Sequence, residues 1–232
     1  MAIKAVIFDF DDTLVQTNQL FDAVKDAFGQ KMASLDLADA RLLTVLNDFD
    51  LANVRLYGGL AKACFPLALG QAYQHYCRQR GKFCDPAQVR EFENMGWQVF
   101  EEPAALLPGA KELLAALKPH YRLVLWTQGD PATQEKRFIS SGLASYFHFF
   151  EVVHGKTALS LARLIERLQI DKANSWAIGN SLRCDINPAL TVGLKAIHLE
   201  MPSWDYEQEE AVGFYYRAGS LEECRIIIHN SQ

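Results

Sequence analysis

Two aspartates near the start of the chain are placed to do chemistry together. An apolar run at 5–8 leads directly into Asp9-Phe10-Asp11-Asp12-Thr13-Leu14. Side chains alternate along a strand, so Asp9 and Asp11 should lie on the same side where the strand ends. Two carboxylates at one point repel each other, which predicts either a divalent cation between them or a division of labour in which one attacks and the other carries a proton. An acidic loop after a strand is the alternative that this segment alone leaves open.

The elements that must position these aspartates form a regular pattern along the chain. Short apolar runs flanked by turn residues predict buried parallel strands, and helical patterns lie between the later runs. The expected strands are 5–8, 123–126, 149–153, 175–178 and 196–199, and the expected helices are 110–117, 131–141, 159–168 and 187–192. This order predicts an α/β fold with a Rossmann-like, doubly wound parallel sheet that helices cover on both faces.

Polar residues follow several of these strands at the point where each one ends. A doubly wound sheet binds its ligand at the carboxyl ends of the strands, so these residues should gather at one site. They are Asp9 and Asp11 after the first strand, Thr127, Gln128 and Gly129 after the second, Lys156 after the third, and Asn180 with Asp185 after the fourth. The set is suited to one anionic substrate.

The segment 17–100 differs from the rest of the chain. Its apolar residues recur at helical spacing, as in Leu20, Val24 and Phe28, and it contains no convincing strand. We therefore expect an all-helical domain inserted after the first strand. The predicted domains are a core formed by 1–16 and 101–232 and a helical domain at 17–100.

Composition narrows the class of protein. The 232 residues are 50% hydrophobic, which allows a full buried core, and the net charge of −5 with no run of Lys or Arg argues against nucleic-acid partners and anionic membrane surfaces. The five cysteines are scattered and lack a CxxC pair, so we expect reduced thiols and a cytoplasmic location. The apolar stretch before Asp9 is too short for a signal peptide, and no segment predicts a membrane span.

Four of these segments carry a family resemblance. Asp9 to Leu14, Thr127 after an apolar strand, the isolated Lys156, and Gly179-Asn180-Ser181-Leu182-Arg183-Cys184-Asp185 resemble, in order and spacing, the four motifs of the haloacid dehalogenase-like (HAD) hydrolase superfamily. The match extends over essentially the whole chain. The helical insertion is similar to the type I cap of that superfamily.

The resemblance implies a role for each motif residue and Mg²⁺ as the cofactor. Asp9 would attack phosphorus to form an aspartyl-phosphate and would also ligate Mg²⁺, with the backbone carbonyl of Asp11 and with Asp185. Asp11 would protonate the leaving group and then deprotonate water. Thr127 would hold a phosphoryl oxygen, helped by backbone N–H groups of the turn it begins, and Lys156 would neutralise the transferring group. An acid at Asp11 separates phosphatases from dehalogenases in that superfamily, because halide leaves without a proton.

Asn180 departs from the family pattern, which usually carries an acid directly after the glycine of the fourth motif. An amide oxygen can still ligate Mg²⁺, but a hard cation prefers carboxylate, so we expect a working site with a weakened Mg²⁺ affinity. Seen without its neighbours, Lys156 would be interpreted as an ordinary solvent-facing loop lysine.

The sequence leaves several alternatives for the identity of the substrate. A type I cap implies a small phosphorylated metabolite, such as a nucleoside monophosphate, phosphoglycolate or a sugar phosphate. In the insertion, Arg55 and Lys62 flank a Gly pair and are candidates to bind substrate, or belong to an ordinary surface turn. A mutase, a phosphonatase, a dehalogenase and an inactive relative that binds a metabolite or a protein are the other functions considered, and monomer and homodimer both stay open. The tail after Leu199 predicts a loop and a last short element at 226–228.

Overall fold

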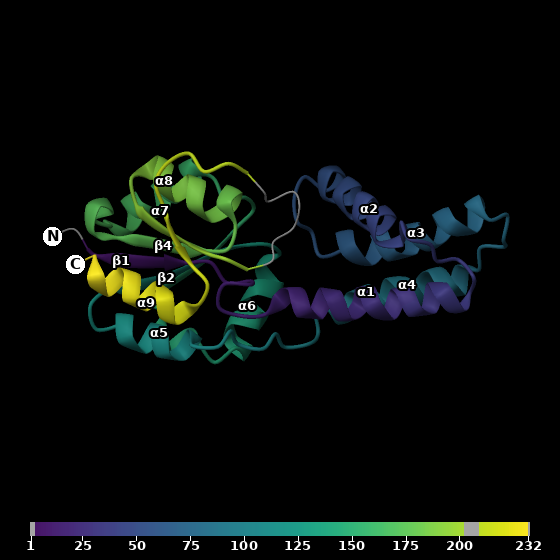
Figure 1. Ribbon diagram of the computed structural model, residues 1–232, viewed down its shortest axis with the longest axis horizontal. Coiled ribbons are helices and arrows are strands. Elements are labelled where there is room, and N and C mark those ends of the chain that lie inside the picture. The colour runs from purple at the N-terminus through teal and green to yellow at the C-terminus, as the bar shows by residue number, and fades with distance from the viewer. Residues whose placement is uncertain (1–2, 202–208, 232) are drawn as a thin grey trace. The chain divides into compact units, whose positions relative to one another are not determined.

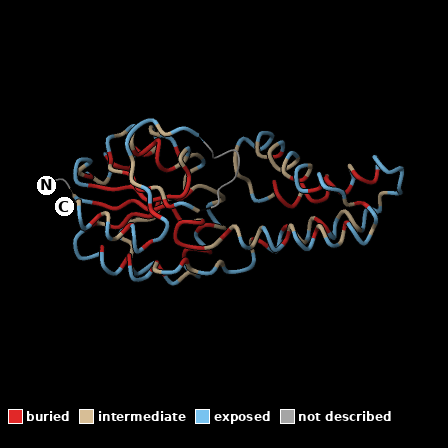
Figure 2. Tube along the Cα trace, viewed as in Figure 1, coloured by how far each residue is buried: buried red, intermediate tan, exposed pale blue. Residues whose placement is uncertain are grey.

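The computed structural model describes residues 3–201 and 209–231. The chain divides into two compact units, Met1–Thr17 with Ala104–Gln232, and Asn18–Pro103. The sequence placed the corresponding boundaries at 16/17 and 100/101. Each unit has its own buried interior, drawn red in Figure 2.

The first unit is built on a six-stranded sheet in which all strand pairs are parallel. The strand order β3-β2-β1-β4-β5-β6 is that of a doubly wound Rossmann-like sheet, which confirms the predicted fold class. The strands are β1 (Ala5–Phe8), β2 (Arg122–Gln128), β3 (Phe149–Val153), β4 (Trp176–Gly179), β5 (Lys195–Leu199) and β6 (Tyr216–Ala218). Since β1 lies between β2 and β4, the order reverses there, and a ligand is expected beyond its carboxyl end.

Helices cover both faces of this sheet (Figure 1). On one face lie α5 (Ala110–Leu117), α6 (Pro131–Ser140) and α9 (Leu221–Asn230), and on the other lie α7 (Ala158–Leu168) and α8 (Asn187–Val192). The alternation of β1 explains the two cores: Val6 and Phe8 pack on the first set of helices, and Ala5 and Ile7 pack on the second. Short turns of helix at Ala144–Tyr146, Lys172–Asn174 and Leu182–Ile186 complete the connections.

The C-terminal part differs from the expectation. The predicted loop after Leu199 falls in part on residues 202–208, which lie outside the described residues. Beyond them, β6 adds an edge strand parallel to β5, and the short element expected at 226–228 belongs to the longer helix α9. Ser220 caps α9 by accepting a hydrogen bond from the Glu223 N–H at 3.2 Å, so the helix begins well before its apolar run.

The second unit consists of α1 (Thr17–Ser34, of which Thr17 belongs to the first unit), α2 (Leu42–Leu56), α3 (Cys64–Gln79) and α4 (Pro86–Gln98). Its core includes Phe28 and Phe92, whose rings meet edge to face with centroids 5.0 Å apart. A Cβ at Gly96 would lie 2.6 Å from the Pro66 Cα, so the glycine allows α3 and α4 to pack closely. Within the described parts of the chain, none of the helices combines the length and the apolar character that crossing a membrane requires.

Candidate active site

The loop after β1 is a tight turn that brings Thr13 back to Asp9. The backbone N–H groups of Thr13, Leu14 and Val15 all donate to the Phe10 carbonyl, and Asp12 adopts the left-handed conformation with φ 56°. Aspartate tolerates that conformation better than most residues. The turn brings the Thr13 hydroxyl back to Asp9, where it donates to Oδ2 at 3.0 Å. The same hydroxyl lies 3.4 Å from the Asn180 Oδ1, so the Thr13 hydroxyl links an oxygen of Asp9 to an oxygen of Asn180.

Lys156 joins the first and fourth motifs. Its ammonium contacts the Asp9 Oδ1 and donates to the Asp185 Oδ1 at 2.6 Å. The Lys156 side chain is only 3% exposed and lies over the Trp126 ring, so the ammonium is shielded from water. Such burial is tolerated because two carboxylates surround the cation. The alternative of a solvent-facing lysine does not describe this position.

Burial and the neighbouring charges both shift the pKa values of Asp9 and Lys156. Burial raises the pKa of the Asp9 carboxyl to about 7, which Lys156 partly offsets and Asp185 reinforces. Burial lowers the pKa of Lys156, but Asp185 and Asp9 outweigh it and hold that pKa above its usual range. We take Lys156 as a permanent cation here. A divalent cation near Asp9 would favour its ionised form further.

Gly179 and Asp185 depend on each other. A Cβ at Gly179 would lie 2.3 Å from the Asp185 Cγ, so only glycine lets this carboxylate pass so close to the end of β4. Asp185 uses the space to accept from the Ser181 N–H with Oδ2 at 3.0 Å while Oδ1 receives Lys156.

Replacing Gly179 by alanine should therefore displace Asp185. We expect the free energy of unfolding to fall by about 1–3 kcal/mol, as for an overpacked core, and any catalytic activity that depends on Lys156 to fall with it. Denaturant unfolding of Gly179→Ala beside Gly219→Ala measures the effect. A Cβ at Gly219 would make only an ordinary 3.7 Å contact with Glu223, so that control should change little. Equal stability of the two variants would contradict the packing argument.

Asp11 is held by residues that the sequence did not single out as its partners. Its Oδ1 accepts from the Thr17 hydroxyl at 2.5 Å and from the Arg137 Nη1 at 3.3 Å, and its Oδ2 accepts from the Gln134 Nε2 at 2.5 Å. Thr17 is the first residue of α1. Gln134 and Arg137 lie one turn apart on α6 and are buried. Polar residues on the core-facing side of a helix would have been the signal for them.

Thr127, Gln128 and Gly129 form the end of β2 and the turn that follows. The Thr127 hydroxyl is 1% exposed and accepts from the Gln134 Nε2 at 2.8 Å. The Gln128 Oε1 accepts from the Lys156 N–H at 3.1 Å, so this side chain fixes the loop that carries the lysine. The Gly129 N–H donates to the Val153 carbonyl. The structure thus joins Asp9, Lys156 and Asp185 directly, and Asp11 with Thr127 through Gln134.

Arg55 and Lys62 belong to the second unit. Arg55 lies in the last turn of α2 and Lys62 lies between α2 and α3, and both are exposed. The glycines between them, Gly58 and Gly59, have positive φ values of 69° and 158°. The segment is therefore a turn between two helices, as the sequence suggested.

The oxygen atoms around Asp9 are the type that a hard cation prefers. Among the residues that the structure describes, no cluster of three or more His, Cys, Asp or Glu side chains is arranged to hold a metal ion. What the site offers is the Asp9 Oδ2 and the neutral Asn180 Oδ1, which share the Thr13 hydroxyl, while the Asp9 Oδ1 and both Asp185 oxygens are engaged by other groups. This donor set fits Mg²⁺, which binds few protein ligands and keeps several waters, but with little negative charge.

Comparison with known proteins places this geometry in a family. The model of the haloacid dehalogenase-like hydrolase family matches residues 3–193. A glyceraldehyde 3-phosphate phosphatase from Pyrococcus abyssi is 24% identical in an alignment of 207 residues that covers 84% of this chain and 80% of that protein.

Solved structures share the fold over nearly the whole chain. A haloacid dehalogenase-like family hydrolase from Xanthomonas campestris is 25% identical, with a TM-score of 0.79 over 99% of this chain and 96% of that one. The HAD-hydrolase YfnB from Bacillus subtilis, solved bound to magnesium, is 18% identical with a TM-score of 0.66 over 98% and 99% of the two chains. Further structural neighbours include 2-haloacid dehalogenases. The chain therefore belongs to the haloacid dehalogenase-like hydrolase family.

Proposed function

We propose that this hydrolase is a Mg²⁺-dependent phosphatase that cleaves phosphomonoesters of small metabolites through an aspartyl-phosphate on Asp9. The observation that carries the proposal is the arrangement at the end of β1. There, Asp9 is paired with the buried Lys156, and a second carboxylate, Asp11, follows two residues later with its own donors. One carboxylate is thus placed to attack, and the other to carry a proton.

In the first half of the reaction an Asp9 oxygen attacks phosphorus and the bond from phosphorus to the leaving oxygen breaks. Asp11 gives a proton to that oxygen, so an alcohol leaves rather than an alkoxide. Lys156 neutralises charge on the Asp9 side of the transferring group, and the Thr127 hydroxyl donates to one of its oxygens. In the second half Asp11 takes a proton from water, which attacks phosphorus and releases phosphate and Asp9.

Asp9 and Asn180, with the Asp11 backbone carbonyl, would hold Mg²⁺. When bound, the ion supplies positive charge opposite the phosphoryl oxygens and brings the anionic substrate against an anionic nucleophile. Asp185 holds Lys156 and would ligate the ion directly or hold its waters. The low charge of this donor set supports a weaker Mg²⁺ affinity than a site with an acid in place of Asn180 would have.

Asp11 favours a phosphatase over a dehalogenase. Cleaving a carbon–halogen bond needs no proton for the leaving halide, so a dehalogenase has no use for an acid held by three donors. The phosphatase from Pyrococcus abyssi adds support, since the substrate in its name, glyceraldehyde 3-phosphate, is a small phosphomonoester. The negative net charge supports small-molecule substrates over nucleic acid, and the thiols of the five cysteines support a cytoplasmic location. Arg55 and Lys62 are proposed to contact the part of the substrate that differs between metabolites.

The test is release of phosphate from a panel that includes glyceraldehyde 3-phosphate, phosphoglycolate, sugar phosphates and nucleoside monophosphates, with and without Mg²⁺. We expect turnover that requires Mg²⁺, and no halide release from 2-chloropropionate. Silence across the panel from folded protein would contradict the proposal. Beryllium fluoride with Mg²⁺ then separates an inactive binder from an assembled site, because a phosphoryl mimic on Asp9 raises the melting temperature only in the latter.

Asn180→Asp tests the metal assignment. A carboxylate in place of the Asn180 amide should bind Mg²⁺ more tightly, so we expect the Mg²⁺ concentration for half-maximal rate to fall about tenfold. Asn94→Asp adds the same charge at an exposed position of α4 and serves as the control. An unchanged Mg²⁺ requirement in Asn180→Asp would place Asn180 away from the metal.

A further inference from the structure

The Gln134 side chain connects two groups that the proposed reaction uses, the Asp11 carboxylate that serves the leaving group and the Thr127 hydroxyl that binds a phosphoryl oxygen. Its Nε2 lies 2.5 Å from the Asp11 Oδ2, 2.8 Å from the Thr127 Oγ1 and 3.1 Å from the Gln128 carbonyl oxygen. The Gln134 amide nitrogen carries two hydrogens and faces three oxygens, so at least one hydrogen is shared between two acceptors. Gln134 is 2% exposed, so water does not compete for them.

Chemistry fixes which way this amide points. The Gln128 carbonyl can only accept a hydrogen bond, and so can the Asp11 carboxylate in its ionised form, so the amide nitrogen has to face them. The Gln134 Oε1, at the other end, is buried and accepts no hydrogen bond from the residues that the structure describes. An unsatisfied buried oxygen is costly, and native structures keep such groups where something else requires the residue. Here the Gln134 amide is required for the hydrogen bonds that its Nε2 donates.

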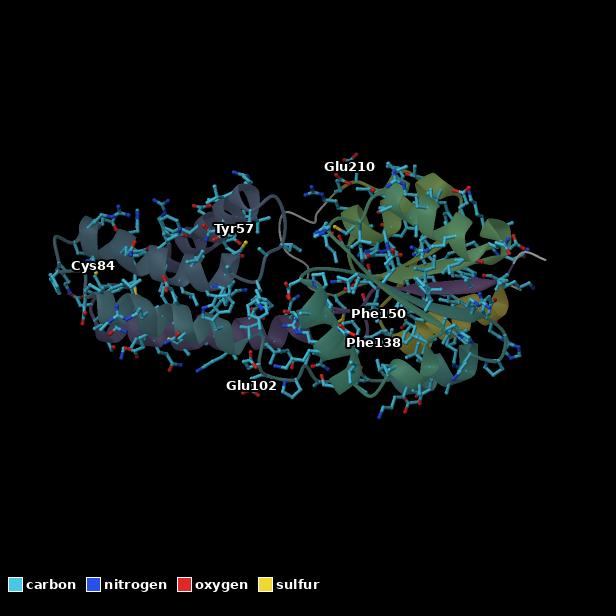
Figure 3. All side chains as sticks on the ribbon, turned by 180° about the vertical axis from the view of Figure 1, so that it is seen from behind. Tyr57, Cys84, Glu102, Phe138, Phe150 and Glu210 are labelled. Carbon is cyan, nitrogen blue, oxygen red and sulfur yellow. The ribbon has the colours of Figure 1, made fainter. Side chains whose placement is uncertain are left out.

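The helix that carries Gln134 is held firmly in the core. The Asp130 side chain caps α6 by accepting from the Thr133 N–H at 2.9 Å, and Pro131 begins the helix. One turn beyond Gln134, Phe138 stacks on Phe150 of β3 with centroids 4.6 Å apart, and Figure 3 labels both rings. The Gln134 amide is therefore presented from a rigid element.

Arg137 acts on the same carboxylate from the next turn of α6. Its Nη1 lies 3.3 Å from the Asp11 Oδ1, while Gln134 holds Oδ2, so the two side chains fix both carboxylate oxygens from one helix. Gln134 alone also reaches Thr127. Because the threonine oxygen accepts from Gln134, its own hydroxyl hydrogen is directed elsewhere, which suits a group that donates to a phosphoryl oxygen.

We propose that Gln134 is a positioning residue that locks the proton-carrying carboxylate of Asp11 and the phosphate-binding hydroxyl of Thr127 into one geometry. This inference rests on the proposed phosphatase function. Gln134 contacts the Asp11 side chain and not the Asp11 backbone carbonyl, Asp9 or Asn180, so it should act on proton transfer and phosphate orientation and leave Mg²⁺ binding unchanged.

The test compares Gln134→Met, which keeps the length of the side chain but removes the amide, with Glu135→Met on the exposed side of α6. Each full-length variant is assayed with the best alkyl phosphate of the panel and with p-nitrophenyl phosphate, whose leaving group departs as an anion without a proton. We expect Gln134→Met to lower kcat about 100-fold for the alkyl ester and several-fold less for the aryl ester, since misplacing a catalytic group by an ångström costs about that much. The Mg²⁺ requirement should not change, and Glu135→Met should behave as the parent.

The outcomes are distinguishable. An equal loss on both substrates, or no loss, in a protein with an active parent would overturn the inference and leave the phosphatase proposal standing. A parent that hydrolyses neither substrate would overturn both. If Gln134→Met melts below the assay temperature, Gln134→Asn provides the same comparison, because it keeps an amide in the pocket but is one methylene too short to span Asp11 and Thr127.

Discussion

Asp9→Asn should abolish phosphate release, with a loss in kcat of about 10⁴-fold or more. Removing a nucleophile costs this much because only binding and charge stabilisation remain. The amide has the shape of the carboxylate and can still meet Thr13 and Lys156, so the loss would reflect chemistry and not collapse of the site. The measurement is Mg²⁺-dependent phosphate release from the best substrate, with Asp26→Asn on the exposed side of α1 as the matched control. Retained turnover with a folded Asp9→Asn protein would exclude an aspartyl-phosphate on Asp9.

The same variant should change how stability depends on pH. Burial raises the pKa of Asp9 from 3.8 to about 7, so the folded state binds a proton that the unfolded chain has already lost. The stabilisation from this group is fully present below about pH 4 and is lost as pH rises through about 7. In Mg²⁺-free buffer the free energy of unfolding of the parent should fall over that range by more than that of Asp9→Asn. Parallel curves would show that Asp9 is ionised throughout.

The sheet and its helices were predictable because each element carries a local signal. The strands β1 and β3 and the helices α5 and α8 have the predicted bounds, since a buried parallel strand is a continuous apolar run and a covering helix shows an apolar stripe. The edge strand β6 carries neither signal. It has three residues, Tyr216, Arg217 and Ala218, of which only Ala218 is buried, and it becomes a strand by pairing with β5.

The last helix was foreseen only in part for a related reason. Three consecutive isoleucines at 226–228 gave no helical period, and the first two are not buried. The residues that define the buried side of α9 are Leu221, Cys224 and Ile228, at spacings of three and four. Ser220 at the N-cap with Glu223 three residues later was the available signal.

The sequence predicted the residues of the candidate site that belong to the four motifs, but not the residues outside the motifs that contact them. Asp9 and Lys156, 147 residues apart, were expected together because both follow strands of one sheet, and their contact agrees with that reasoning. Gln134 and Arg137 were not foreseen as partners of Asp11, because that contact depends on which side of α6 faces the loop after β1. The signal was present in the spacing of Gln134, Arg137 and Phe138, which puts two polar residues on the stripe that carries a core phenylalanine.

Lys156→Met should have the largest effect on stability. The side chain is 3% exposed and its ammonium is shared by Asp9 and Asp185, which are 9% and 5% exposed. Removing the cation leaves two buried carboxylates without compensation, so we expect a loss of about 3–5 kcal/mol in the free energy of unfolding in Mg²⁺-free buffer. The methionine keeps most of the apolar volume, so the loss would arise from charge. Lys111→Met, at an exposed position of α5, should change stability by less than about 0.5 kcal/mol.

Adding Mg²⁺ makes this variant a test of where the metal binds. A cation held by Asp9 and Asn180 would neutralise part of the charge that Lys156 no longer balances, so Mg²⁺ should raise the melting temperature of Lys156→Met by more than that of the parent. Catalysis should remain low even at saturating Mg²⁺, because an ion held by Asp9 and Asn180 would not replace the charge that Lys156 places between Asp9 and Asp185, and the transferring group needs both charges. Recovery of full activity by Mg²⁺ alone would contradict separate roles for the two cations. A Lys156→Met protein as stable as the parent in chelator would contradict the argument that Lys156 compensates the buried charge of Asp9 and Asp185.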